Sequence, residues 1–322
     1  MQRRKFLKTL ALSGALISMP SLANATNSKG IKMRTITLNN GVKMPVLGLG
    51  LLNIRDLKEC QRVVEDALEV GYRLIDTAQA YANEEAVGAA IKASGIKREE
   101  LFITTKLFRE FATEQKAIPS FEQSCKKLGV DCVDLFLIHQ PINDVYGAWR
   151  AMTKLYKEKR IRALGVSNFY PDKLVDFVMN NEITPAVNQF VCNPFRQELE
   201  LAKLLQEYNI TYEAFSPFAQ GKNNIFSNEI LAKIAKKHNK SIAQVILRWL
   251  FERNIVSIPK TTSKERMREN LNIFDFNLDE SDRKQILTLN TGNVGINHQD
   301  PKMIKWLNER SIGESLAHTK KD

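Results

Sequence analysis

The sequence contains little cysteine and little histidine. Its 322 residues include four of each. The cysteines form no C-x-x-C pair, and no two histidines lie four residues apart beside an acidic residue, so neither a disulfide scaffold nor a metal centre is indicated. We expect Cys60, Cys125, Cys132 and Cys192 to be small buried residues. We expect no bound metal.

Long apolar runs, linkers and glycine-rich phosphate loops are also missing. No segment reaches the roughly 18 uninterrupted apolar residues of a membrane-spanning helix, so no integral membrane segment is expected. No linker rich in Pro, Gly or Ser divides the chain, which predicts one domain over residues 33–322. The string GLGLL at 48–52 lacks the G-x-G-x-x-G spacing, which argues against a doubly wound open sheet, the alternative architecture.

The net charge of +11 raises the question of a polyanionic partner. Four of the basic residues lie within the first 25 positions, where there is no acidic residue. The others alternate with acids, as in REEL at 98–101 and SKERMREN at 263–270, and form no basic run interleaved with aromatic residues. Solvated helix faces explain this pattern, and nucleic-acid binding is not expected.

The first 25 residues resemble an export signal. A basic start is followed by an apolar stretch from Thr9 to Met19, and Ala23 and Ala25 form an A-x-A cleavage pattern. Arg3-Arg4 within RRKFLK resembles the twin-arginine consensus, so we expect residues 1–25 to be a signal peptide and the protein to be periplasmic. A general secretory signal with incidental arginines is the alternative.

The remaining chain alternates strand-like and helix-like patterns. ITLNNGVKMP at 36–45 predicts an N-terminal β-hairpin that turns at Asn-Asn-Gly. Eight mostly apolar runs follow, separated by stretches with helical spacing; they span 46–50, 72–77, 101–106, 133–139, 161–167, 186–190, 211–216 and 255–259. Such runs are typical of parallel strands buried on both faces. We therefore predict an α/β protein, a (β/α)8 TIM barrel.

Polar residues at the carboxyl ends of barrel strands are the first candidates for function. Asp76, Lys106 and His139 end the second, third and fourth predicted strands, and Tyr81 lies five residues after Asp76. A tyrosine can deliver a proton to an oxygen that gains negative charge, and a nearby lysine lowers the pKa of its phenol. Asp76 would hold Lys106, and His139 would align the oxygen. These roles suit hydride transfer to a carbonyl group.

Four strings make a family resemblance specific. DTAQAYANEEAVG at 76–88, LGVDCVDLFLIHQP at 128–141, ALGVSNF at 163–169 and IPKTTSKERMREN at 258–270 resemble the motifs of the aldo-keto reductase family, in the same order and spacing. The resemblance runs from about residue 33 to 290. It implies an NADPH-dependent carbonyl reductase whose catalytic tetrad is Asp76, Tyr81, Lys106 and His139.

The resemblance also implies a binding site for NADP(H). Ser167, Asn168 and Gln189 would bind the nicotinamide carboxamide, and the Phe215 ring would stack on the nicotinamide where the family usually has Tyr. The remaining cofactor-binding residues that it implies are Ser216, Lys260, Thr261, Arg266, Glu269 and Asn270. The cations Lys260 and Arg266 suit the 2′-phosphate, which favours NADPH over NADH.

The substrate pocket departs from the family pattern. Leu52 and Gln140 occupy positions where the family often has Trp, which predicts a wider and more polar pocket, lined also by Phe108 and His139. The C-terminal loop, residues 291–322, is expected to influence substrate choice. The expected substrates are small aldehydes, ketones, dicarbonyls and keto-sugars. We expect the protein to be a monomer.

Two other functions remain open at this stage. A sensor or regulatory subunit that binds NADP would need no tetrad, so Tyr81 and Lys106 together favour catalysis. A sugar-processing barrel would need paired carboxylates, but Glu84 and Glu85 are adjacent on a predicted helix and face different directions.

Overall fold

The computed structural model describes residues 23–26, 32–292 and 297–313. The predicted hairpin is present: β2 (Lys32–Thr37) pairs with β3 (Lys43–Pro45) in antiparallel register, and Gly41 in the turn has a φ of 84°. Strand β1 (Ala23–Thr26) pairs with the outer edge of β2. Most of the predicted signal peptide, residues 1–22, lies outside the described residues.

Eight parallel strands form the centre of the molecule; each overlaps one of the predicted apolar runs, and β6 and β9 extend one residue beyond theirs. Every strand pairs with the next one along the chain, from β4 to β11. The strands are β4 (Leu49–Gly50), β5 (Leu74–Asp76), β6 (Phe102–Leu107), β7 (Val133–Ile138), β8 (Ile161–Ser167), β9 (Val187–Val191), β10 (Thr211–Phe215) and β11 (Val256–Ser257). The predicted (β/α)8 fold is confirmed.

The first and last strands meet and close the barrel. Leu47 forms a parallel bridge with Ser257, and the amide of Gly48 donates to the Ser257 carbonyl at 2.9 Å. The amide of Gly50 donates to the Pro259 carbonyl at 3.2 Å. A Cβ at position 50 would lie 2.7 Å from the carbonyl oxygen of Ile258, so this close approach requires glycine.

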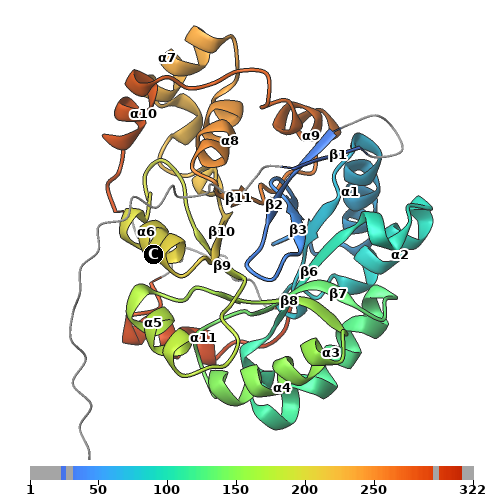
Figure 1. The fold of residues 1–322 in the computed structure, drawn as a ribbon. Helices are drawn as coiled ribbons and strands as arrows, with labels where there is room; N and C mark the ends of the chain where they lie inside the picture. The colour runs from blue at the N-terminus through green and yellow to red at the C-terminus, as the bar shows by residue number, and fades with distance from the viewer. Residues whose placement is uncertain (1–22, 27–31, 293–296, 314–322) are drawn as a thin grey trace, which may run out of the picture.

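Helices surround the strands on the outside (Figure 1). They are α1 (Leu57–Val70), α2 (Glu84–Ser94), α3 (Glu114–Leu128), α4 (Val145–Lys157), α5 (Pro171–Met179), α6 (Leu199–Glu207), α7 (Glu229–His238), α8 (Ile242–Glu252), α9 (Lys264–Leu271), α10 (Glu280–Leu287) and α11 (Pro301–Asn308). Among the described residues, no helix is both long and apolar enough to cross a membrane.

Helix α1 shows how the local sequence sets these elements. The Asp56 side chain accepts a hydrogen bond from the amide of Glu59 at 2.7 Å and begins the helix, and Gly71 ends it with a φ of 119°. Val63, Val64 and Ala67 lie on one face at helical spacing and are buried against the barrel. Because the eight strands are parallel, their carboxyl ends and the loops that follow them all lie on the same side of the barrel.

Candidate active site

The four residues of the predicted tetrad meet at the carboxyl ends of neighbouring strands. Asp76 is the last residue of β5, Lys106 lies next to the end of β6, and His139 follows β7 directly. Tyr81 ends the 3-10 turn η1 (Gln79–Tyr81), which begins three residues after β5. The pairing of β5 with β6 and of β6 with β7 therefore brings the side chains together.

Lys106 joins the tetrad through its ammonium group. Its Nζ lies 2.6 Å from Asp76 Oδ1, and it donates to the Thr77 carbonyl at 2.9 Å and to Tyr81 Oη at 3.4 Å. Both Lys106 and Asp76 are buried. A buried ion pair needs further hydrogen bonds to offset the loss of hydration, and here the carbonyl and the phenol supply them. The ammonium is thus held at a fixed distance from the phenol.

Tyr81 holds its proton firmly. Burial raises the pKa of Tyr81, and the Lys106 ammonium lowers it by a smaller amount, so the net direction is upward. Lys106 therefore acts in the direction expected from the sequence, but burial outweighs it. The phenol is protonated at neutral pH, which is the state that a proton donor needs.

His139 faces Tyr81 across the site. The two ring centroids are 5.7 Å apart in an edge-to-face arrangement. Burial lowers the pKa of His139 well below its ordinary value, and the charge of Lys106 lowers it further. The imidazole is therefore neutral at neutral pH and offers one N–H donor, which can align a carbonyl oxygen.

A cavity of about 960 Å³ opens beside these residues. Its wall includes Asp76, Tyr81 and His139 of the tetrad, whereas Lys106 lies behind them. All ten residues proposed for the cofactor contribute to the wall: Ser167, Asn168, Gln189, Phe215, Ser216, Lys260, Thr261, Arg266, Glu269 and Asn270. The cavity therefore unites the tetrad with residues that lie up to 194 positions away along the chain.

Three amide and hydroxyl side chains are fixed at the end of β8 and within β9. Ser167 Oγ donates to the Gln189 carbonyl at 2.9 Å, and Asn168 Nδ2 donates to the His139 carbonyl at 3.0 Å. Gln189 Nε2 donates to Asp76 Oδ2 at 2.8 Å and to Glu213 Oε2 at 2.9 Å. Because both hydrogens of the Gln189 side-chain amide are used, the side-chain oxygen Oε1 is the atom left to accept a hydrogen bond from a bound molecule.

Glu213 is a residue of this network that the sequence did not identify. It is fully buried within β10, and its Oε1 has no hydrogen-bond partner in the described part of the chain. Burial raises the pKa of Glu213 to about 8, and the charge of Asp76 acts in the same direction. The carboxyl group is therefore protonated at neutral pH, while Asp76 is paired with Lys106.

The segment after β11 carries the cations of the cavity wall. Lys260 and Arg266 line the cavity, and neither has an ion-pair partner in the described ranges 23–26, 32–292 and 297–313. Ser263 begins α9 by accepting a hydrogen bond from the amide of Arg266 at 3.3 Å. Two cations without a carboxylate partner beside a helix N-terminus suit a phosphate group.

The structure separates the residues expected in the substrate pocket. Leu52, His139 and Gln140 line the cavity, but Phe108 does not. The Phe108 ring lies 6.4 Å from the Phe111 ring and 4.9 Å from the Arg109 guanidinium carbon. His298 of the C-terminal loop lines the cavity, a position that the sequence left undecided.

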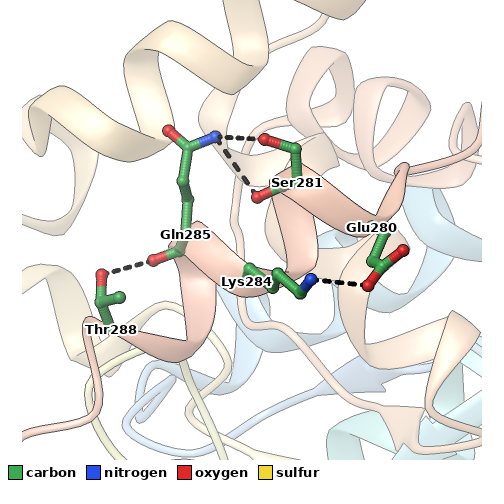
Figure 2. Close-up of a pocket in the computed structure, with 5 residues that line it drawn as sticks. All are labelled: Glu280, Ser281, Lys284, Gln285 and Thr288. Atoms are coloured by element: carbon green, nitrogen blue, oxygen red, sulfur yellow. Dashed lines mark hydrogen bonds and ion pairs between the residues drawn. The ribbon is translucent and has the colours of Figure 1, made fainter.

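Another hollow lies on the exposed face of α10, where its polar groups bond within the helix (Figure 2). Lys284 Nζ lies 2.7 Å from Glu280 Oε1, and Gln285 Nε2 donates to Ser281 Oγ at 3.2 Å. Such pairs are usual on a solvated helix face. In the described residues, no group of three His, Cys, Asp or Glu side chains is placed to hold a metal ion. The large cavity is therefore the candidate active site.

Comparison with known proteins identifies the family. A model of the Aldo/keto reductase family matches residues 46–291. The chain belongs to the aldo/keto reductase family. The family assignment confirms the enzyme class that the sequence predicted, an oxidoreductase that acts on carbonyl groups.

Individual aldo/keto reductases are similar over most of their length. The glyoxal reductase of Bacillus subtilis is 46% identical over 257 residues, which span 80% of this chain and 92% of that protein. The 9,11-endoperoxide prostaglandin H2 reductase of Trypanosoma cruzi is 44% identical over 257 residues, 79% of this chain and 91% of that one. A Bombyx mori aldo-keto reductase crystallised with NADP is 33% identical, with a TM-score of 0.80 over 85% of this chain and 98% of the other.

Proposed function

We propose that this protein uses NADPH to reduce the carbonyl group of small dicarbonyl compounds and related small aldehydes, ketones and keto-sugars. The observation that carries the proposal is the position of Lys106 Nζ, 2.6 Å from Asp76 Oδ1 and 3.4 Å from Tyr81 Oη beside the cavity. The similarity to the Bacillus subtilis glyoxal reductase supports dicarbonyls as substrates, and the Bombyx mori complex supports NADP as cofactor.

The tetrad residues divide the proton chemistry among them. When NADPH is bound, it supplies the hydride to the carbonyl carbon. Tyr81 then donates its proton to the carbonyl oxygen, and the Lys106 ammonium stabilises the phenolate that remains. Asp76 keeps Lys106 charged and in place, and neutral His139 donates a hydrogen bond that orients the carbonyl oxygen.

The residues around the cavity fit the cofactor. Gln189 and Asn168 offer amide groups beside the tetrad, where a carboxamide can be held. The Phe215 ring contributes to the same wall and can stack on a flat ring. Lys260 and Arg266, without ion-pair partners among the described residues, fit the 2′-phosphate that distinguishes NADPH from NADH.

The test is NADPH oxidation by the protein from Thr26 onward, followed by absorbance, with glyoxal, methylglyoxal, small aldehydes and keto-sugars. Tyr81→Phe removes only the phenol oxygen and should lower kcat at least about 100-fold while NADPH binding persists. Tyr156→Phe makes the same change on α4, outside the cavity wall, and should leave kcat unchanged. Equal activity of Tyr81→Phe and wild type would refute the assigned role.

A sensor that binds NADP with little turnover is the alternative function. It would bind NADPH tightly in wild type and in Tyr81→Phe and would reduce none of the compounds in either form. The hydrogen-bonded tetrad beside the cavity favours catalysis, since binding alone does not need a lysine held against a phenol.

We further propose that residues 1–25 direct export of the folded protein to the periplasm by the twin-arginine route. The RRKFLK string at 3–8 and the A-x-A pattern support this proposal. Replacing Arg3 and Arg4 by lysine should retain the protein in the cytoplasm, as measured by cell fractionation. We also propose a monomer, for which size-exclusion chromatography with light scattering is the test.

A further inference from the structure

His298 reaches the cavity from the C-terminal loop. It lies just before α11, whose Met303 and Leu307 pack with Ile142 in a small apolar cluster. Ile142 follows β7 by only four residues, so α11 is fixed beside the loop that carries His139 and Gln140. This packing places the His298 side chain on the same cavity wall as those two residues.

The His298 ring has unsatisfied hydrogen-bonding groups. It is 8% exposed, and within the described part of the chain neither Nδ1 nor Nε2 has a hydrogen-bond partner. Its contact with Tyr170 is between rings, with centroids 6.3 Å apart. A neutral imidazole always carries one donor and one acceptor, and leaving either one buried and unpaired is unfavourable. A molecule in the cavity is therefore the natural partner.

The surroundings of His298 select an uncharged partner. Burial lowers the pKa of His298 to about 4, and the charge of Arg196 acts in the same direction, so the ring is neutral at neutral pH. Gln140, on the same wall, has a buried amide oxygen without a partner among the described residues; it can accept a hydrogen bond from a hydroxyl group of a bound molecule but not from a carbonyl oxygen. The Lys and Arg residues that line the cavity, Lys260 and Arg266, belong to the segment after β11.

We propose that the N–H of His298 donates a hydrogen bond to a second, uncharged oxygen of the substrate while Tyr81 and His139 hold the reacting carbonyl. This subsite would make the enzyme prefer a 2-oxoaldehyde over an aldehyde of the same length that has no second oxygen. His298 and His139 line the same cavity, so one bound molecule can contact both rings. The inference rests on the proposed carbonyl reduction.

The experiment compares kcat/KM for methylglyoxal and for propanal, which differ by the second oxygen. His298→Leu should lower kcat/KM for methylglyoxal about tenfold and that for propanal less than about twofold, because only one substrate loses a hydrogen bond. His298→Gln keeps a donor and an acceptor and should retain most of the preference. Equal losses for both substrates, or no loss for either, would overturn the proposal.

Gln299→Leu is the matched control, since Gln299 is the next residue of the loop, is exposed and does not line the cavity. It should leave both values unchanged; a selective loss here would assign the effect to the loop rather than to His298. NADPH affinity, measured by fluorescence, should stay constant in every variant. If wild type reduces neither substrate, the proposed reduction of small dicarbonyls and aldehydes fails. If wild type is active but its preference does not depend on His298, only the subsite fails.

Discussion

Replacing Glu213 by glutamine should make the protein more stable, and increasingly so as the pH rises. Burial raises the pKa of Glu213 in the folded protein to about 8, against an ordinary value of 4.5. Between these two values the folded state binds the proton and the unfolded state releases it, so the free energy of unfolding falls with rising pH. The Glu213 carboxyl group therefore lowers the free energy of unfolding most at and above its pKa in the folded protein.

The magnitude follows from the same linkage. Each pH unit within the window corresponds to about 1.4 kcal/mol, so at pH 7 the buried carboxyl lowers the free energy of unfolding by about 3 kcal/mol. Glu213→Gln keeps an oxygen that accepts the bond from Gln189 but has no proton to release. The difference between variant and wild type should approach a constant below about pH 4 and should grow by about 3 kcal/mol from there to pH 7.

Urea unfolding at several pH values between about 4 and 8 measures this difference directly. Glu182→Gln is the control, because Glu182 is on the surface and pairs with the exposed Lys157 at 3.0 Å. Its effect should change little with pH. If the Glu213→Gln difference is the same at all pH values, Glu213 does not hold a proton in the folded protein, and the assignment of charges around Gln189 is wrong.

Three further predictions test other parts of the molecule. The pKa of His139 lies well below 6.5, so a plot of kcat/KM against pH should show no inflection near pH 6.5. An inflection there in wild type that is absent from His139→Asn would contradict this assignment. Arg266→Ala should raise KM for NADPH about 10-fold or more and leave KM for NADH nearly unchanged, since only NADPH carries the 2′-phosphate. Gly88→Ala places a Cβ 2.5 Å from the Lys127 carbonyl oxygen and should lower the free energy of unfolding by about 1–3 kcal/mol in urea; an unchanged midpoint would mean that α2 can shift away from α3.

The barrel strands and the tetrad could be predicted because both are local signals. A strand buried on both faces is a short apolar run, and Asp76, Lys106 and His139 are the polar residues where three such runs end. Ser167 at the end of β8 pairs with Gln189 in the middle of β9, so these two residues were also recognisable from their positions along strands. For these residues, position along a strand is sufficient to define position in space.

Glu213 and His298 depend on contacts between distant segments. Glu213 lies in the middle of an apolar run, and a carboxylate there was a signal for a buried polar network; its partner Gln189 belongs to another strand. His298 follows no strand, and its place is set by the packing of α11 against Ile142. For Phe108, position along a strand was misleading. It follows β6 directly, but its ring packs against Phe111 and it does not line the cavity.

The meeting of β4 with β11 has a consequence for how the protein is made. The amides of Gly48 and Gly50 find their acceptors at Ser257 and Pro259, which are synthesised more than 200 residues later. Until those residues leave the ribosome, the growing sheet has two open edges that can pair with other chains. Completion of the barrel is therefore a late event that depends on a contact between the two ends of the sheet, and a nascent chain truncated before β11 should aggregate.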